Sequence, residues 1–241
     1  MKTIFITGGS RGIGEAIVRR AIGRYNVAFC YNTNAERANA LVEELSNFGG
    51  IFAVQCDVSK RSEVEKAVSQ VKKRFGKIDI AVLNAGIARQ KMFCDLTADD
   101  LEKMMSVNFV GAFNTAQEVL KDMTSRKSGK LIAVASVWGE VGASCETDYS
   151  ASKSALIGMC KALAKEYAPS GINVNVVSPG VIRTDMLNGF SQKDLISLTE
   201  EIPLGRLGTP DDVADAVMCF ADGLDYVTGQ VLAVNGGFSI R

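Results

Sequence analysis

The chain has 241 residues, 47% of them hydrophobic, so it is long enough to enclose a substantial core. Lysine plus arginine and aspartate plus glutamate number 27 each, which gives no electrostatic reason to bind nucleic acid or an anionic membrane. Histidine is missing and the six cysteines stand apart, so neither a metal site nor a disulfide framework is predicted. With no signal peptide evident and no apolar run of about 18 residues, we expect a cytoplasmic protein.

Short apolar runs alternate with longer segments that place apolar residues at three- and four-residue spacing, typical of helices. The predicted strands are 3–7, 26–31, 51–55, 78–83, 130–136, 172–178 and 230–234. Because helical segments connect consecutive strands, we expect one α/β domain over residues 1–241, with a doubly wound, seven-stranded parallel sheet. Ligands of such sheets bind beyond the carboxyl ends of the strands, so functional residues should directly follow strands.

The first predicted strand runs into the stretch GGSRGIG, which then opens a helix. Gly8, Gly12 and Gly14 have the context of a dinucleotide-binding loop, in which glycines let the backbone approach a pyrophosphate at a helix N-terminus. The spacing G-x-x-x-G-x-G is a variant of the common motif. A glycine-rich structural turn is the alternative interpretation.

The end of the second predicted strand bears on the choice of cofactor. NAD-binding chains commonly place an acid there to hold the ribose 2′-hydroxyl, whereas this chain has Tyr31-Asn32 and no acid before Glu36. Arg11 in the glycine loop can bind a phosphate, or be an ordinary solvated residue. The pattern therefore favours NADPH over NADH.

Polar residues and a glycine also follow the next two strands. Asp57-Val58 come after the third strand, where a carboxylate can accept a hydrogen bond from an adenine amine or cap a helix. Asn84-Ala85-Gly86 come after the fourth strand and would let the chain pass close to a cofactor, although the same residues are common in turns.

Three residues further along supply a means of proton transfer without histidine. Ser136 ends the fifth predicted strand, and Tyr149 and Lys153 share one face of a helix because they are four residues apart. A cation near a phenol lowers its pKa from the usual value of about 10. Each residue alone also has an ordinary structural interpretation, but their occurrence together, in order, favours catalysis on a carbonyl or alcohol.

The motifs taken together resemble the short-chain dehydrogenase/reductase family over nearly the whole chain. They are Thr7-Gly8-x-x-x-Gly12-Ile13-Gly14, Asn84-Ala85-Gly86, Asn108, Ser136, Tyr149-x-x-x-Lys153 and Pro179-Gly180. The resemblance implies a Rossmann-type fold and NADP(H)-dependent reduction of a ketone. It implies that Ser136 binds the carbonyl, that Tyr149 is the general acid, and that Lys153 binds the nicotinamide ribose and lowers the tyrosine pKa. Asn108 would hold a water in the proton path.

The resemblance also implies a set of cofactor contacts at the strand ends. They are Gly8, Ser10, Arg11, Gly12, Ile13, Gly14, Tyr31, Asn32, Asp57, Val58, Asn84, Ala85, Gly86, Tyr149, Lys153, Pro179, Gly180, Ile182 and Thr184. It further implies a homotetramer, for which the apolar content of residues 104–120 and 155–164 offers modest support. Residues 186–205 are expected to form a short helical lid over the substrate.

The stretches SGINVNVVSPGVIRTDM and PLGRLGTPDDVADAV are similar to 3-oxoacyl-acyl-carrier-protein reductases of fatty acid biosynthesis. This likeness implies a ketone carried on acyl carrier protein, docked through basic residues beside the cleft. Lys127 stands where one such residue is expected, but Ser170 replaces the other.

Two alternatives stay open. Glu140, Glu146 and Asp148 lie beside Trp138 near the expected substrate mouth, where acids would suit a cationic substrate or be solvated loop charges. The stretch WGEVGAS resembles reductases of an aminoketone (5-aminopentanone) modification on elongation factor P. The chain could also be a non-catalytic NADPH-binding sensor or subunit, although such a protein has no need of the tyrosine.

Overall fold

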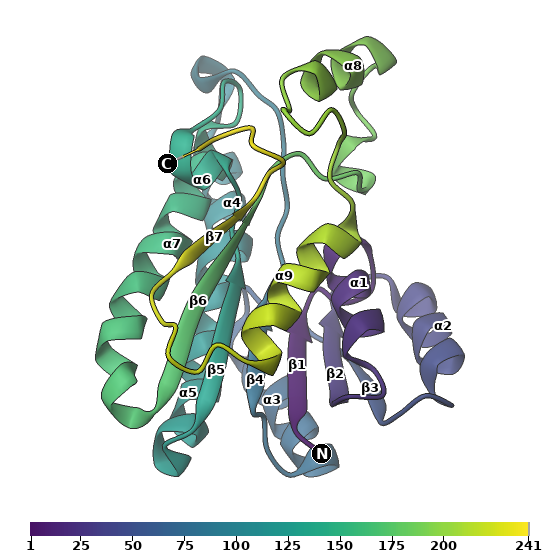
Figure 1. Cartoon of the computed structure of the whole chain (residues 1–241), viewed down its shortest axis with the longest axis vertical. Helices are drawn as coiled ribbons and strands as arrows, with labels where there is room; N and C mark the ends of the chain where they lie inside the picture. The colour runs from purple at the N-terminus through teal and green to yellow at the C-terminus, as the bar shows by residue number, and fades with distance from the viewer. Residues whose placement is uncertain (241) are drawn as a thin grey trace.

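The computed structural model describes residues 1–240 and contains one seven-stranded, all-parallel sheet in the order β3-β2-β1-β4-β5-β6-β7 (Figure 1). The strands are β1 (Thr3–Thr7), β2 (Asn26–Tyr31), β3 (Ile51–Gln55), β4 (Ile80–Leu83), β5 (Gly129–Val134), β6 (Ile172–Pro179) and β7 (Val231–Val234). The predicted doubly wound α/β fold is confirmed. The strand order reverses between β1 and β4, and a crevice for ligands forms at such a switch point.

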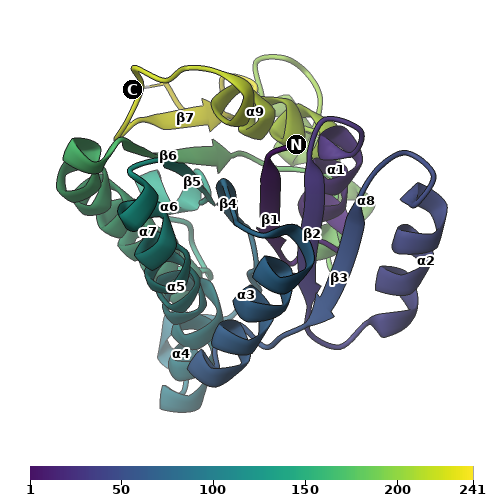
Figure 2. The same ribbon diagram turned by 90° about the horizontal axis from the view of Figure 1, so that it is seen from below.

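Helices cover both faces of the sheet (Figure 2). They are α1 (Gly12–Ala21), α2 (Ala35–Leu45), α3 (Arg61–Phe75), α4 (Ala98–Met105), α5 (Gly111–Arg126), α6 (Trp138–Val141), α7 (Thr147–Tyr167), α8 (Gln192–Glu200) and α9 (Pro210–Asp222). Side chains from α1, α2 and α9 form one buried core with the sheet, and side chains from α3, α5 and α7 form the other. Two cores on opposite faces explain why the central strands are apolar throughout rather than alternating.

Short helical turns complete the chain. Three are 3₁₀ turns, at Phe93–Asp95, Ala168–Ser170 and Asp185–Leu187, and Ser106–Val110 is a π-helical turn between α4 and α5. The helix expected within residues 186–205 is present as α8, which stands beyond the carboxyl ends of the strands (Figure 1). Ser191 caps it reciprocally with Asp194, which explains where it begins.

Within residues 1–240, no helix has the length and apolar character needed to cross a membrane. The same described residues contain no cluster of three or more acidic, cysteine or histidine side chains able to hold a metal ion. The cytoplasmic location stays a prediction.

Candidate active site

The predicted glycine loop connects β1 to α1 and has the backbone that such a loop requires. Gly8 and Gly12 have φ values of +68° and +54°, in the left-handed region that favours glycine. A Cβ on Gly14 would lie 2.0 Å from the carbonyl oxygen of Gly8, so no larger residue fits there. Gly12 faces Thr184 instead, with 3.5 Å between its would-be Cβ and the threonine methyl carbon. The loop is therefore shaped for close approach of a pyrophosphate.

Asn84 braces this loop from the end of β4. Its side-chain amide donates hydrogen bonds to the carbonyl oxygens of Thr7 (3.0 Å) and Gly8 (3.1 Å). In return the Thr7 hydroxyl accepts from the backbone N–H groups of Asn84 (2.9 Å) and Ala85 (3.0 Å). The sequence predicted a close backbone passage at this point, and the structure adds that the asparagine side chain holds the glycine loop in shape.

Asp57 is held mainly by its own turn. One carboxylate oxygen accepts from the Ser59 backbone N–H (3.0 Å) and hydroxyl (2.7 Å), and the other lies 3.8 Å from the Lys60 ammonium. The alternative predicted from the sequence, helix capping by Asp57 or Ser59, is not found, because the N-cap position of α3 is Lys60 and has no side-chain cap hydrogen bond. An adenine contact at Asp57 stays a prediction.

The other predicted cofactor residues lie along the carboxyl edge of the sheet. Ser10 and Ile13 belong to the glycine loop and the first turn of α1, Tyr31 and Asn32 end β2, Val58 follows β3, and Pro179 ends β6.

Gly180 and Ile182 follow β6 and are enclosed by protein. A Cβ on Gly180 would lie 2.8 Å from that of Asn235, and Ile182 is buried against the core beneath α9. The Ile182 side chain therefore has a packing role, and a cofactor contact at Ile182 stays a prediction. Thr184, opposite Gly12, is partly exposed.

Ser136, Tyr149 and Lys153 come together as predicted, at the junction of β5 and α7. All three side chains are buried, and the Tyr149 phenol is hydrogen-bonded with Ser136. The Lys153 ammonium lies 5.8 Å from the centre of the Tyr149 ring and donates a hydrogen bond to the carbonyl oxygen of Val134 (2.9 Å). Gly86 borders the same group, because its would-be Cβ lies 3.5 Å from the Lys153 ammonium.

Burial shifts the pKa values of Tyr149 and Lys153 in opposite directions. It raises the pKa of Tyr149 to about 12, an effect opposed by the hydrogen bond with Ser136 and reinforced by the negative charge of Glu146. It lowers the pKa of Lys153 to about 8. Desolvation of the phenolate dominates the pKa of Tyr149 in this structure, and the expectation that the Lys153 cation lowers that pKa stays a prediction. Tyr149 is therefore protonated and neutral at pH 7.

Asn108 is fully buried in the π-helical turn, a feature often found at functional sites. Its side-chain oxygen accepts from the Ile87 backbone N–H (2.8 Å), and its amide donates to the Ile87 carbonyl (2.9 Å) and the Ser152 hydroxyl (3.1 Å). Ser152 in turn donates to the Tyr149 carbonyl (2.7 Å). The side chain thus ties the loop after β4 to α7, and a water held by Asn108 stays a prediction.

The three acidic side chains near the expected substrate mouth each have a different hydrogen-bond partner. Asp148 is buried, accepts a hydrogen bond from the Tyr149 backbone N–H (2.9 Å), and pairs with Arg89 (2.8 Å). Glu140 accepts from the Ser178 hydroxyl. Glu146 is hydrogen-bonded with Gln90, and burial raises its pKa. The interpretation of a shared acidic cluster therefore needs correction, and Glu146 is the acid whose charge reaches the Tyr149 phenol.

Arg89 is a site residue that sequence reasoning missed. It follows β4 in the loop that also contains Ile87, and it contacts both the side chain and the carbonyl oxygen of Asp100 besides Asp148. A single arginine in a loop carries no local pattern, and its partner Asp148 is 59 residues away along the chain. Nothing in the sequence marked this pairing.

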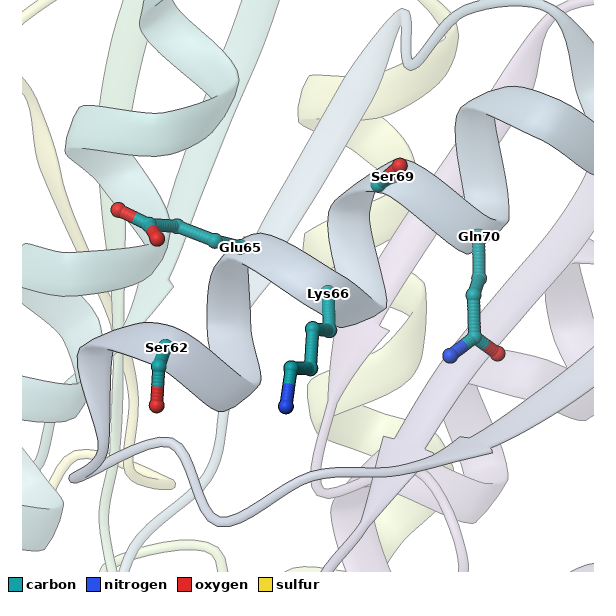
Figure 3. Close-up of a pocket in the computed structure, with 5 residues that line it drawn as sticks. All are labelled: Ser62, Glu65, Lys66, Ser69 and Gln70. Carbon is teal, nitrogen blue, oxygen red and sulfur yellow. The ribbon is translucent and has the colours of Figure 1, made fainter.

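Two hollows lie outside the catalytic trio. One lies between α8 and the segment after β6, and it is lined by Arg183, Thr184, Leu187, Asn188, Gln192, Leu195, Ile196, Thr199, Glu200 and Leu207. The other is on the outer face of α3, lined by Ser62, Glu65, Lys66, Ser69 and Gln70 (Figure 3). All five side chains that line the second hollow come from one helix, and Glu65 among them is paired with Arg61. The first hollow adjoins the glycine loop, because Thr184 both lines it and faces Gly12.

Comparison with known proteins decides the family. The family model described as "Enoyl-(Acyl carrier protein) reductase" matches residues 8–239. The chain belongs to the short-chain dehydrogenase/reductase family. As a member of this family it is an oxidoreductase, in agreement with the Ser136, Tyr149 and Lys153 arrangement.

Relatives within the family match along their full lengths. The uncharacterized oxidoreductase YmfI of Bacillus subtilis is 39% identical, over 98% of this chain and 98% of its own. The 3-oxoacyl-[acyl-carrier-protein] reductase FabG of Aquifex aeolicus is 38% identical, over 98% of this chain and 96% of its own. Carbonyl reductase family member 4 of Xenopus laevis is 39% identical, over 100% and 99%.

Proposed function

We propose that this short-chain dehydrogenase/reductase is an NADPH-dependent carbonyl reductase that acts on 3-oxoacyl thioesters carried by acyl carrier protein. The observation that carries the proposal is the buried trio of Ser136, Tyr149 and Lys153 beside Gly86 and the glycine loop. The names of the reductases from Aquifex and several other bacteria support the substrate class. Positive φ values at Gly8 and Gly12, with no space for a side chain at Gly14, support a dinucleotide-binding role for the glycine loop.

A reduced nicotinamide supplies the hydride to the carbonyl carbon when it is bound. The residues of the chain control the oxygen. Ser136 donates a hydrogen bond to the carbonyl oxygen, and Tyr149, neutral at pH 7, gives its proton to the same oxygen as negative charge develops there. The Lys153 ammonium stabilises the phenolate that Tyr149 becomes. Burial of all three side chains keeps water from weakening these interactions.

The test is oxidation of NADPH in the presence of acetoacetyl thioesters, with the Tyr149→Phe variant as the matched control. The parent should reduce the thioester, and loss of the proton donor should lower kcat by about 100-fold or more. Cofactor binding should persist in the variant. Turnover by Tyr149→Phe at the parent rate would contradict the assigned acid, and tight NADPH binding with no turnover of any ketone would favour the non-catalytic alternative.

The preference for NADPH rests on the end of β2. Tyr31 and Asn32 stand where a carboxylate would repel a 2′-phosphate, and Arg11 is exposed at the start of α1. Equal or better turnover with NADH at matched concentrations would overturn this part of the proposal.

The docking residue expected for an acyl carrier needs correction. Lys127 follows α5 in a left-handed conformation, two residues before β5 begins, and Ser170 ends a 3₁₀ turn two residues before β6 begins. Both lie at the amino edge of the sheet, whereas Ser136 lies at the carboxyl edge. Within one chain Lys127 therefore does not border the site, and it lends no support to carrier docking there.

A second candidate substrate is the aminoketone on elongation factor P. The observation that favours it is Glu146, a partly buried carboxylate whose charge acts on the Tyr149 phenol. A carboxylate there would attract an ammonium group on the substrate. If this candidate is right, 5-amino-2-pentanone should be preferred over acetoacetyl-CoA, and Glu146→Gln should remove that preference. A preference for the thioester in the parent enzyme would exclude it.

A further inference from the structure

A small third core lies beyond the carboxyl edge of the sheet and joins segments that are far apart in the chain. Its buried members are Val181, Ile202 and Leu207, and the partly buried side chains packed against it are Trp138, Leu187, Leu195, Leu198 and Phe238. These residues come from α6, the segment after β6, α8 with the residues that follow it, and the C-terminal segment. The third core therefore attaches α8, the predicted lid, to the rest of the molecule.

The contribution of α8 to the third core is small. The helix reaches it through Leu195 and Leu198, and both side chains are only partly buried. An element held by few buried apolar contacts opens locally at a lower free energy than the fold as a whole. The position of α8 should therefore depend on the contacts that the other segments make with the same core.

The C-terminal segment, residues 235–239, contacts two parts of the third core. The ring of Phe238 packs edge-on against the indole of Trp138, with 5.3 Å between the ring centroids and an interplanar angle of 82°. The Gly236 carbonyl oxygen accepts from the Leu204 backbone N–H (3.1 Å), and a Cβ on Gly236 would lie 2.7 Å from the Ile202 side chain. The segment, which runs from β7 toward α6 (Figure 1), thus joins α6 to the residues that follow α8.

A hydrogen-bonded turn gives the C-terminal segment a defined shape. The Asn235 side-chain oxygen accepts from the Gly237 backbone N–H (3.0 Å), and its amide donates to the Ser239 carbonyl oxygen (2.8 Å). Phe238 lies within this turn. Its ring is therefore presented to Trp138 by a preformed turn rather than by a loose chain end.

Trp138 also contacts Ser136 of the candidate site. The Trp138 backbone N–H donates to the Ser136 hydroxyl oxygen (3.2 Å), which leaves the hydroxyl hydrogen available as a donor. The side chain of the same tryptophan packs against Phe238 and the third core. One residue therefore connects the orientation of Ser136 with the attachment of α8.

We propose that Phe238 is a positioning residue for the reaction, because through Trp138 and the third core it holds α8 in place beside the candidate site and so increases the affinity for the ketone. The inference rests on the proposed carbonyl reduction. A ketone that binds with α8 in place has its apparent affinity reduced by the fraction of molecules in which α8 is displaced. Phe238 keeps that fraction small.

Removing the ring should change KM much more than kcat. Phe238→Ala should raise KM for an acetoacetyl thioester by about tenfold and leave kcat within about threefold of the parent, because saturating ketone draws α8 back into place. Phe238→Tyr keeps the ring and should stay within about twofold of the parent in both constants. Ile240→Ala is the matched control, since Ile240 is 87% exposed two residues further along, and it should leave KM within about twofold.

Two measurements made without cofactor or ketone test the position of α8. Chymotrypsin cleaves after leucine, and cleavage after Leu195 or Leu198 requires α8 to detach or unfold. Phe238→Ala should accelerate this cleavage by about tenfold and leave cleavage outside residues 186–205 unchanged. Trp138 is the one tryptophan of the chain, so quenching of its emission by acrylamide reports the contact with Phe238 and should increase in the same variant.

The outcomes separate the two proposals. A higher KM with faster cleavage in α8 supports the role of Phe238, whereas an unchanged KM or unchanged cleavage in α8 overturns it. Faster cleavage along the whole chain, or an equal change in Phe238→Tyr, indicates general destabilisation and also overturns it. A parent that reduces no ketone overturns the proposed carbonyl reduction, and cleavage in α8 then decides by itself whether Phe238 holds the helix. Should Phe238→Ala fail to fold, Phe238→Leu, which leaves a smaller void, takes its place in every measurement.

Discussion

At the scale of single residues, the candidate site contains two buried ionisable side chains, Tyr149 and Lys153, in a chain that has no histidine. Lys153 is fully desolvated, and its ammonium has a backbone carbonyl as hydrogen-bond partner rather than a carboxylate. Burying a charge without a counter-ion lowers stability. The chain therefore carries a destabilising residue where the proposed mechanism needs a cation, a common compromise at active sites.

Replacing Lys153 with methionine should stabilise the fold while removing activity. The pKa falls from 10.5 to about 8 on folding, so the charged form is disfavoured in the folded chain by about 3 kcal/mol at pH 7. Because the folded value is the lower one, this penalty is complete below pH 8 and disappears as the pH rises toward 10.5. Urea denaturation should show Lys153→Met to be more stable by about 1–3 kcal/mol at pH 7, with the difference shrinking by pH 10. A variant less stable than the parent at pH 7 contradicts the desolvation argument.

The kcat/KM of carbonyl reduction should be constant around pH 7 and should fall at alkaline pH. Lys153 loses its proton near pH 8, whereas Tyr149, with a pKa of about 12, stays protonated. In the reducing direction kcat/KM should therefore fall about tenfold per pH unit once Lys153 has titrated. The measurement is kcat/KM from pH 6 to 10. A limb near pH 6.5 would be inconsistent with a chain that contains no histidine.

At the scale of elements, the loop after β4 is attached to α7 in its first turn, next to Tyr149. Asp148 joins them, because it accepts from the Tyr149 backbone N–H and from the Arg89 guanidinium. Asn108 makes a second attachment through Ile87 and Ser152. The first turns of α7 are thus fixed from two directions, which holds Tyr149 in position, as the proposed proton transfer requires.

Arg89→Met should destabilise the protein and impair catalysis together. It leaves the Asp148 carboxylate buried without its cation, a change that costs about 3 kcal/mol. Combining it with Asp148→Asn should recover part of that loss, since the neutral amide still accepts from the Tyr149 N–H. Thermal and urea unfolding of the single and double variants, with kcat for each, test this. A single variant as stable as the parent would show that the ion pair is unimportant.

The sequence predicts the elements well and their contacts less well. Apolar runs alternating with helical periodicity predict the seven strands, and glycine and polar residues at strand ends predict Gly12, Ser136 and Tyr149 as neighbours of one crevice. The pairing of Arg89 with Asp148 and the direction of the Tyr149 pKa shift could not be predicted from the sequence. Both depend on burial and on contacts between distant segments, which no local pattern encodes.

At the scale of the whole molecule, the exposed apolar side chains include groups on two surfaces that bear on assembly. One comprises Leu101, Val110 and Phe113 on and between α4 and α5, and the other lies around β7, where Leu232 is exposed at the last strand of the sheet. Exposed apolar groups of this kind commonly mark contacts between subunits. They support the proposed homotetramer, which the family resemblance implied.

Sedimentation at micromolar concentration should give a mass about four times that of one chain. Phe113→Glu places a charge within the α4–α5 surface and should lower that mass, because an unpaired charge is costly in an apolar contact. Lys121→Glu, an exposed change on the same helix, is the control. A parent protein that sediments as a monomer would contradict the tetramer.

The strand order also determines when each strand of the sheet gains its neighbours as the chain is synthesised. All five residues of β1 are buried, and β1 pairs with β2 on one side and β4 on the other. The first neighbour begins at Asn26, but the second is reached only at Ile80. While the ribosome makes the residues in between, one edge of β1 has no partner strand. β1 is therefore the first strand to be made, and one of its edges stays unpaired until β4 has been synthesised. A chaperone that covers this edge would be most useful during that interval.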